Sequence, residues 1–283
     1  MAPPVPFSWA PHPDAWLVVT LLLAGYAYAL SAWGPRHAPG GRAATRGQKA
    51  CYLLGVAALW LGADWPVDAV SDALFSVHMV QHLLFSLVAP PLLILGTPGW
   101  LLRRLLRHRP VFRVMRVVTR PLVALVIFNA WLAVYHVPAV VNLSATNDLF
   151  HFAAHVAWVV AALVMWWPVL SPLPELPHLS YPVRMMYLFA QSIVPTVPAS
   201  FLTFGRTPLY SAYEDTTRAW GVSVLTDQQV AGLLMKIGGG LLLWAAIAWL
   251  FFRWAFEDRT GGPDVLYWRD LEPNLSDAEL TQR

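Results

Sequence analysis

Long apolar runs alternate with short polar segments along most of the chain. Each run approaches the roughly 20 residues that a helix needs to cross the hydrocarbon core of a bilayer. None of the runs alternates apolar and polar residues in the way that is typical of a membrane β-barrel. The pattern therefore predicts seven transmembrane helices, centred on Ala15–Trp33, Ala50–Gly62, Leu74–Leu95, Leu122–Tyr135, Leu149–Trp167, Met185–Phe204 and Val230–Phe252.

The composition agrees with a lipid environment. Charged residues make up 12% of the chain, which is about half the share usual in soluble domains. We expect an all-α, polytopic membrane protein, with a seven-transmembrane-helix bundle over residues 15–255, a short outer tail at 1–14 and a cytoplasmic tail at 256–283. The amino-terminal segment has no basic leader, so the sequence predicts no removable signal peptide.

Lysine and arginine are distributed unevenly among the predicted loops. The first and third loops are basic, whereas the second and fourth contain neither residue. Because cytoplasmic loops carry the excess of positive charge, this distribution predicts an outer amino terminus and a cytoplasmic carboxyl terminus. The formal net charge of +3 is thus explained by membrane orientation, and no nucleic-acid partner is needed to account for it.

Four histidines form two pairs in the outer half of the predicted bundle. His78 and His82 lie in the third apolar run, and His151 and His155 open the fifth. Residues four apart share one face of a helix, with Cβ atoms about 5–6 Å apart, so both imidazoles of a pair can bind one ion. Two facing pairs supply four nitrogen ligands of the kind preferred by copper, zinc, iron and nickel.

Three further residues are candidate metal ligands. His136 closes the fourth run on the same side, Met79 offers a thioether, and Asp64 ends the second run, where it can also orient an imidazole. The simpler alternative is that the histidines form hydrogen bonds between helices, each worth about 0.6–2 kcal/mol. Two pairs at one depth favour a metal site, because ionisable residues inside a membrane are costly and tend to be functional.

Two polar residues mark the seventh run. Asp227 precedes the run and is expected to cap its helix. Lys236 lies about two turns further in, where an ammonium needs a partner, a wet cavity or an outward path for its long side chain.

Three segments of the chain resemble a known family. "DWPVDAVSDALFSVHMVQHLLFSLVAPPLLILGTP", "HFAAHVAWVVAALVMWWPV" and "LTDQQVAGLLMKIGG" are similar to signature segments of the multi-spanning CtaG-like assembly factors of cytochrome c oxidase. The likeness runs from about residue 50 to 255 and implies a seven-helix protein of the bacterial inner membrane that handles copper during oxidase maturation. The ligands that it implies are His78, His82 and His155, and the polar positions that it matches are His151, His136 and Asp64. Lys236 departs from the resemblance, which implies an aromatic residue at that position.

These observations support three hypotheses. The first is a copper-binding assembly factor that resides in the lipid bilayer and passes copper to a subunit of cytochrome c oxidase. The second is an intramembrane zinc hydrolase in which Asp64 acts as the general base. The third is haem ligation by one histidine from each pair.

Overall fold

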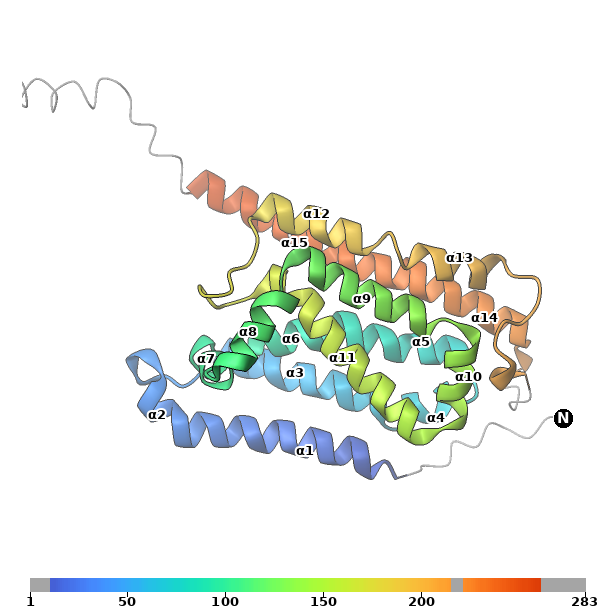
Figure 1. The fold of residues 1–283 in the computed structure, drawn as a ribbon, viewed down its shortest axis with the longest axis horizontal. Helices are drawn as coiled ribbons and strands as arrows, with labels where there is room; N and C mark the ends of the chain where they lie inside the picture. The colour runs from blue at the N-terminus through green and yellow to red at the C-terminus, as the bar shows by residue number, and fades with distance from the viewer. Residues whose placement is uncertain (1–10, 215–220, 261–283) are drawn as a thin grey trace, which may run out of the picture.

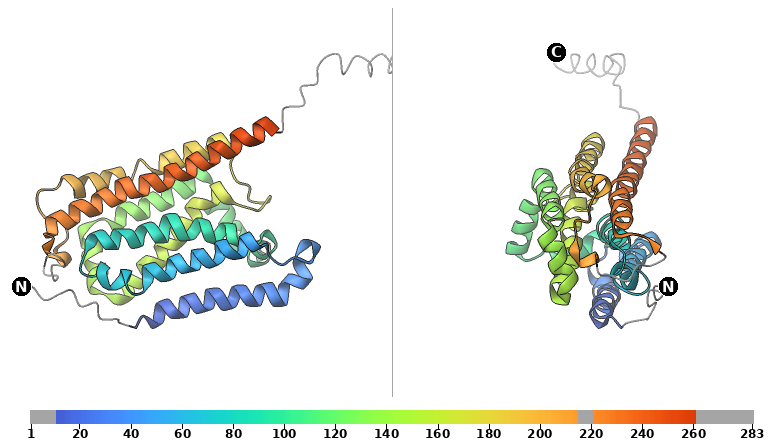
Figure 2. Two further views of the ribbon diagram at one scale, coloured as in Figure 1. Left: turned by 180° about the vertical axis from the view of Figure 1, so that it is seen from behind. Right: turned by 90° about the vertical axis from the view of Figure 1, so that its right-hand side faces the viewer.

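The computed structural model describes residues 11–214 and 221–260, and within these ranges it contains helices and no strand (Figure 1). The helices run side by side as a bundle, which is seen end-on in Figure 2. Short helical turns connect them at both ends, including η2 (Pro39–Gly41) and η4 (Ser211–Tyr213). The longer elements are α1 (Pro13–Tyr28), η1 (Ala29–Trp33), α2 (Gly34–His37), α3 (Arg46–Ala63), α4 (Val67–Ser71), α5 (Phe75–Leu83), η3 (Leu84–Val88), α6 (Ala89–Gly96), α7 (Gly99–Leu105), α8 (Arg109–Val118), α9 (Pro121–Tyr135), α10 (Pro138–Thr146), α11 (Asp148–Leu170), α12 (Tyr181–Gln191), α13 (Thr196–Phe204), α14 (Val224–Leu233), η6 (Leu234–Gly238) and α15 (Gly239–Thr260).

Several of these stretches can cross a membrane. Five of them are long and apolar enough to span the hydrocarbon core. Helices α8 and α9 are bent by 80° relative to each other and make a sixth span only if the pair counts as one. The all-α membrane bundle is thereby confirmed, whereas the count of seven spans and the orientation stay predictions. The five stretches are Pro13–His37, Phe75–Gly96, Asp148–Leu170, Tyr181–Phe204 and Val224–Asp258.

The predicted second span corresponds to α3. Among the described residues, this helix is not apolar enough over its length to count as a span. The reason is that its first turn holds Arg46, Gln48 and Lys49. The predicted tails at 1–14 and 256–283 lie mostly outside the described residues, although α15 continues to Thr260.

Helices α3 and α6 approach each other closely through a glycine. A Cβ added to Gly96 would lie 2.4 Å from the backbone nitrogen of Tyr52 and 2.6 Å from its Cα. The Tyr52 ring stacks on Tyr26 of α1 at a centroid distance of 3.8 Å, and the Tyr26 hydroxyl donates to the Gly96 carbonyl over 2.9 Å. Gly96 therefore joins three helices at one point, as small residues do in membrane bundles.

Three long helices contain a π-helical segment of five residues. These segments are η1 in the first helix, η3 between α5 and α6, and η6 between α14 and α15. Wider turns of this kind occur as single bulges within α-helices and are frequent at functional sites. Here η3 begins two residues after His82, and η6 contains Met235 and Lys236.

Candidate metal centre

The two predicted histidine pairs meet in the bundle. His78 and His82 come from α5, and His151 and His155 come from the first turns of α11. The Nε2 atoms of His78 and His82 lie 2.8 Å apart, and those of His151 and His155 lie 3.1 Å apart. Across the two helices, the ring centroid of His78 is 5.8 Å from that of His151 and 6.0 Å from that of His155.

Three of these imidazoles can ligate one ion. His78, His151 and His155 each offer a ring nitrogen, and these three atoms all lie within 4.8 Å of one another. Zinc–imidazole bonds are about 2.0–2.1 Å long, so two neighbouring nitrogen ligands on one ion lie about 2.8–3.3 Å apart. The spacing within each pair falls in this range, so each pair fits a metal ion with nitrogen ligands.

Side chains from neighbouring helices hold the imidazoles in place. The Tyr135 hydroxyl lies 3.3 Å from Nε2 of His78 and 3.0 Å from the hydroxyl of Ser144. The His82 ring packs on Trp158, with 4.6 Å between ring centroids. Since partners of this kind fix the orientation of ligating imidazoles, Tyr135 belongs to the candidate site.

Asp227 positions the helix that carries His78. Its carboxylate accepts hydrogen bonds from the backbone N–H groups of Phe75 over 2.7 Å and Ser76 over 3.1 Å, which are free amides at the start of α5. The prediction that Asp227 caps its own helix is wrong, because Ser223 immediately precedes α14 and accepts from the backbone of Thr226. Asp227 lies one turn further along and is directed toward α5.

An acidic cavity of about 610 Å³ leads to the cluster. His151 and His155 form part of its wall, and its acidic residues are Asp14, Asp68, Asp72 and Asp148. Gln81 donates to Asp68 over 2.9 Å, and His12 lies 3.4 Å from the same carboxylate. Burial raises the pKa of Asp68 above its ordinary value, although His12 and Gln81 oppose this effect. Acids around such an opening favour the entry of a cation.

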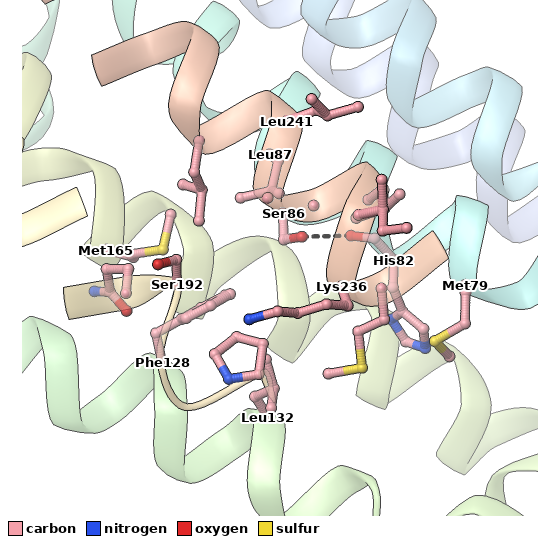
Figure 3. Close-up of a pocket in the computed structure, with 18 of the residues that line it drawn as sticks. Met79, His82, Ser86, Leu87, Phe128, Leu132, Met165, Ser192, Lys236 and Leu241 are labelled. Atoms are coloured by element: carbon pink, nitrogen blue, oxygen red, sulfur yellow. Dashed lines mark hydrogen bonds between the residues drawn. The ribbon is translucent and has the colours of Figure 1, made fainter. Parts of the chain in front are cut away.

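A second, apolar cavity of about 310 Å³ is lined by two other predicted ligands, His136 and Met79, together with His82. Figure 3 shows Met79 and His82 side by side in its wall. The Nδ1 atom of His136 lies 2.7 Å from the carbonyl of Leu132 and must donate to it, so the Nε2 atom of the neutral ring keeps its lone pair. This Nε2 atom is buried and has no hydrogen-bond partner among the described residues. His136 and Met79 therefore lie beside His82 and outside the group of three.

Asp64 is engaged in a different interaction. Its carboxylate accepts from the indole nitrogens of Trp16 over 2.8 Å and Trp60 over 2.7 Å, and from the backbone nitrogen of Trp65 over 2.8 Å. Burial acts to raise the pKa of Asp64, but these three donors hold it below its ordinary value. Asp64 thus fastens α1 to the end of α3, and it is not one of the three residues whose ligand atoms converge.

Replacing Asp64 with alanine is expected to loosen α1 without emptying the metal site. The change leaves the indole N–H groups without their acceptor, and loss of one such partner costs about 1–3 kcal/mol. Thermal unfolding in detergent and metal analysis of the same sample measure the two effects. Asp258→Ala, at an exposed position of α15, is the control, and lost metal in a fully stable Asp64→Ala protein would instead make Asp64 part of the metal site.

Sequence reasoning missed several residues that support the cluster. Tyr135 adjoins His136 at the end of an apolar run, and a polar aromatic residue beside a candidate ligand is a usable signal. Gln81 lies between the two histidines of α5 and donates to the carbonyl of Gly62 over 2.7 Å. Their contacts join residues far apart in the chain, so spacing alone does not reveal them.

Comparison with known proteins identifies the family. The chain is similar to uncharacterized proteins of Mycobacterium bovis and Mycobacterium tuberculosis, each 27% identical over 237 residues, and to one of Mycobacterium leprae, 24% identical over 233 residues. These matches cover 75% of this chain and 35% of each relative, so the chain spans about a third of the length of the curated relatives that it matches. No solved structure matches significantly.

The strongest of these findings is a family match that extends over most of the bundle. It covers residues 24–257, which include all seven predicted site residues. The chain belongs to the cytochrome c oxidase caa3 assembly factor (Caa3_CtaG) family.

Proposed function

We propose that this protein binds copper at the histidine cluster and supports its delivery to a subunit of cytochrome c oxidase during assembly. The observation that carries the proposal is the group of three imidazoles, His78, His151 and His155, with ligand atoms within 4.8 Å of one another. The family is one of oxidase assembly factors, which supports the oxidase as the client.

The chemistry of the ligands suits transfer better than permanent storage. Imidazole binds copper readily, and Cys51, the only cysteine of the chain, is not one of the residues whose ligand atoms converge. His82 lies 2.8 Å from His78 at the edge of the group and can exchange with one of the three ligands. Exchange of one ligand at a time allows an ion to leave without passing through a state with no ligands.

The acidic cavity provides the route to the cluster. Its carboxylates attract a cation, and His151 and His155 form the part of its wall that belongs to the metal group. Under the predicted orientation this cavity opens on the outer side of the bacterial inner membrane. Copper then reaches the imidazoles without crossing the apolar part of the bundle.

The zinc hydrolase is the less favoured alternative. It requires a general base beside the metal-bound water, and the predicted base, Asp64, is occupied by three N–H donors. The haem alternative requires room for a macrocycle beside the imidazoles. That space holds the rings of Tyr135 and Trp158, 5.0 and 4.6 Å from the His82 ring, and of Phe85, 4.9 Å from the His155 ring.

Metal analysis of the purified protein tests the proposal. We expect about one copper per chain after expression with copper, no Soret band, and displacement of the ion by acid, because imidazole must be deprotonated to bind a metal. Stoichiometric zinc that copper does not displace would contradict the proposal in favour of the hydrolase. A Soret band would contradict it in favour of haem. In cells, deletion of the gene should lower the copper content of the oxidase, and expression of the chain should restore it.

A further inference from the structure

The apolar cavity beside the metal group has one charged side chain whose role is unassigned. Lys236 comes from η6, and in Figure 3 its side chain extends across the cavity toward Phe128 and Ser192, while His82 and Met79 lie on the other side. At 1.5 Å per residue, Lys236 lies roughly 18 Å along the helix from Val224. It is therefore deep within the span Val224–Asp258.

The ammonium of Lys236 has a neutral partner and, within the described part of the chain, no counter-ion. Its Nζ atom donates to the hydroxyl of Thr196, at the break between α12 and α13. A lysine ammonium has three donors, so two remain for a ligand. Among the described residues that line the cavity there is no aspartate or glutamate. Lys236 is exposed on the surface of the bundle, and an ionisable residue within a membrane span marks a functional site by default.

A second polar donor lies in the cavity wall and, unlike Lys236, has no partner among the described residues. The indole Nε1 of Trp158 is buried and without a hydrogen-bond acceptor among the described residues, and the residue is 2% exposed. The rest of the wall is mainly apolar, with leucine and methionine the commonest residues, and its polar members are His82, Ser86, His136, Gln191 and Ser192. An apolar cavity with a few polar donors has the composition of a small-molecule site.

The mouth of the cavity opens on the surface of the bundle. Ile237, Leu241 and Trp244 belong to its lining and are 56%, 66% and 54% exposed. These apolar side chains lie on α15 and the preceding η6, so they face lipid when the helix spans the bilayer. A ligand can therefore enter sideways from the hydrocarbon layer.

We propose that the apolar cavity binds a long-chain carboxylate, with the carboxyl group on Lys236 and the acyl chain along the apolar wall toward the mouth. One negative charge matches the single ammonium. The bound carboxylate neutralises the charge of the Lys236 ammonium. A phospholipid does not supply this group, because its phosphate is held in the headgroup layer.

The experiment uses the full chain in nanodiscs of zwitterionic lipid, with metal removed by chelation, and palmitate labelled at its carboxyl carbon as the probe. Hexadecanol, which has the same chain length and a neutral head, is the matched ligand. We expect saturable binding of palmitate, about 10- to 100-fold tighter than that of hexadecanol, because a charge-assisted hydrogen bond gives the difference. Because metal is absent, the result is independent of the proposed copper site.

The two lysines of the chain form a matched pair of variants. Lys236→Met should remove the preference for palmitate, Lys236→Arg should keep it, and Lys49→Met, at an exposed position of α3, should leave it unchanged. Leu241→Trp should weaken binding of both ligands by narrowing the mouth. Equal binding of palmitate and hexadecanol by the natural chain would overturn the proposal, as would a preference that survives Lys236→Met. Displacement of palmitate by equimolar phosphatidylglycerol would overturn the carboxylate assignment.

Discussion

Replacing His78 with alanine is expected to lower the affinity of the cluster for copper by at least about 100-fold. Loss of a residue that merely orients a ligand already costs about 10- to 100-fold in metal affinity, and His78 is one of the three proposed ligands. It also contacts His82 and Tyr135, so its loss leaves the remaining rings without their neighbour. Copper titration in detergent and metal content after purification measure the effect.

The other histidines give this prediction a graded control. His155→Ala should match His78→Ala, since both belong to the group of three. His82→Ala should weaken binding less, because His82 lies at the edge of the group. His108→Ala, at an exposed position before α8, should have no effect. Unchanged copper content in a His78→Ala, His155→Ala double variant that still folds would refute the shared site.

Gly96→Ala is expected to destabilise the whole bundle. The added Cβ would lie 2.4–2.7 Å from three atoms of Tyr52, two of which are backbone, so α3 and α6 must move apart. Overpacking of a close contact typically costs about 1–3 kcal/mol, and here the Tyr26 hydroxyl also loses its position over the Gly96 carbonyl. We expect a clearly lower midpoint of thermal unfolding in detergent.

Gly25→Ala supplies the matched control for this glycine. Gly25 lies within α1, and no neighbouring atom comes within 4 Å of its added Cβ. Alanine is favoured over glycine inside a helix by roughly 0.5–1 kcal/mol, so this variant should be as stable as the natural chain or slightly more so. Equal stability of both variants would show that α3 and α6 tolerate separation.

The sequence predicted that the two histidine pairs lie close together, whereas the number of spans stays a prediction. Spacing of four residues is a property of a single helix, and the common depth follows from where each apolar run begins, so both could be used to bring His78, His82, His151 and His155 together. Asp227 escaped prediction, because its partners in α5 are about 150 residues away in the chain. The same is true of Asp64, where the indole of Trp16 occupies a carboxylate that the local sequence leaves free.

The number of spans was harder to predict, because hydropathy reports the composition of a helix and not its packing against other helices. Helix α3 has a polar first turn, yet its remaining residues pack on α6 through Tyr52. Helices α8 and α9 are separated by a bend of 80°, which a window of apolar residues does not reveal. Both cases depend on how a helix meets its neighbours.

The π-helical segment η3 lies between two parts of one long helix, α5 and α6, that contact different neighbours. Upstream, α5 must turn His78 and His82 toward α11; downstream, α6 must turn Gly96 toward Tyr52. An α-helix advances by about 100° per residue, so the one additional residue of a π turn rotates everything beyond it by nearly a third of a circle. Substitutions cannot reproduce that rotation, whereas an insertion or deletion can. In descendants of this chain, a single codon gained or lost within residues 84–88 can thus rotate the imidazoles of α5 relative to α6. The apolar composition of the span remains the same.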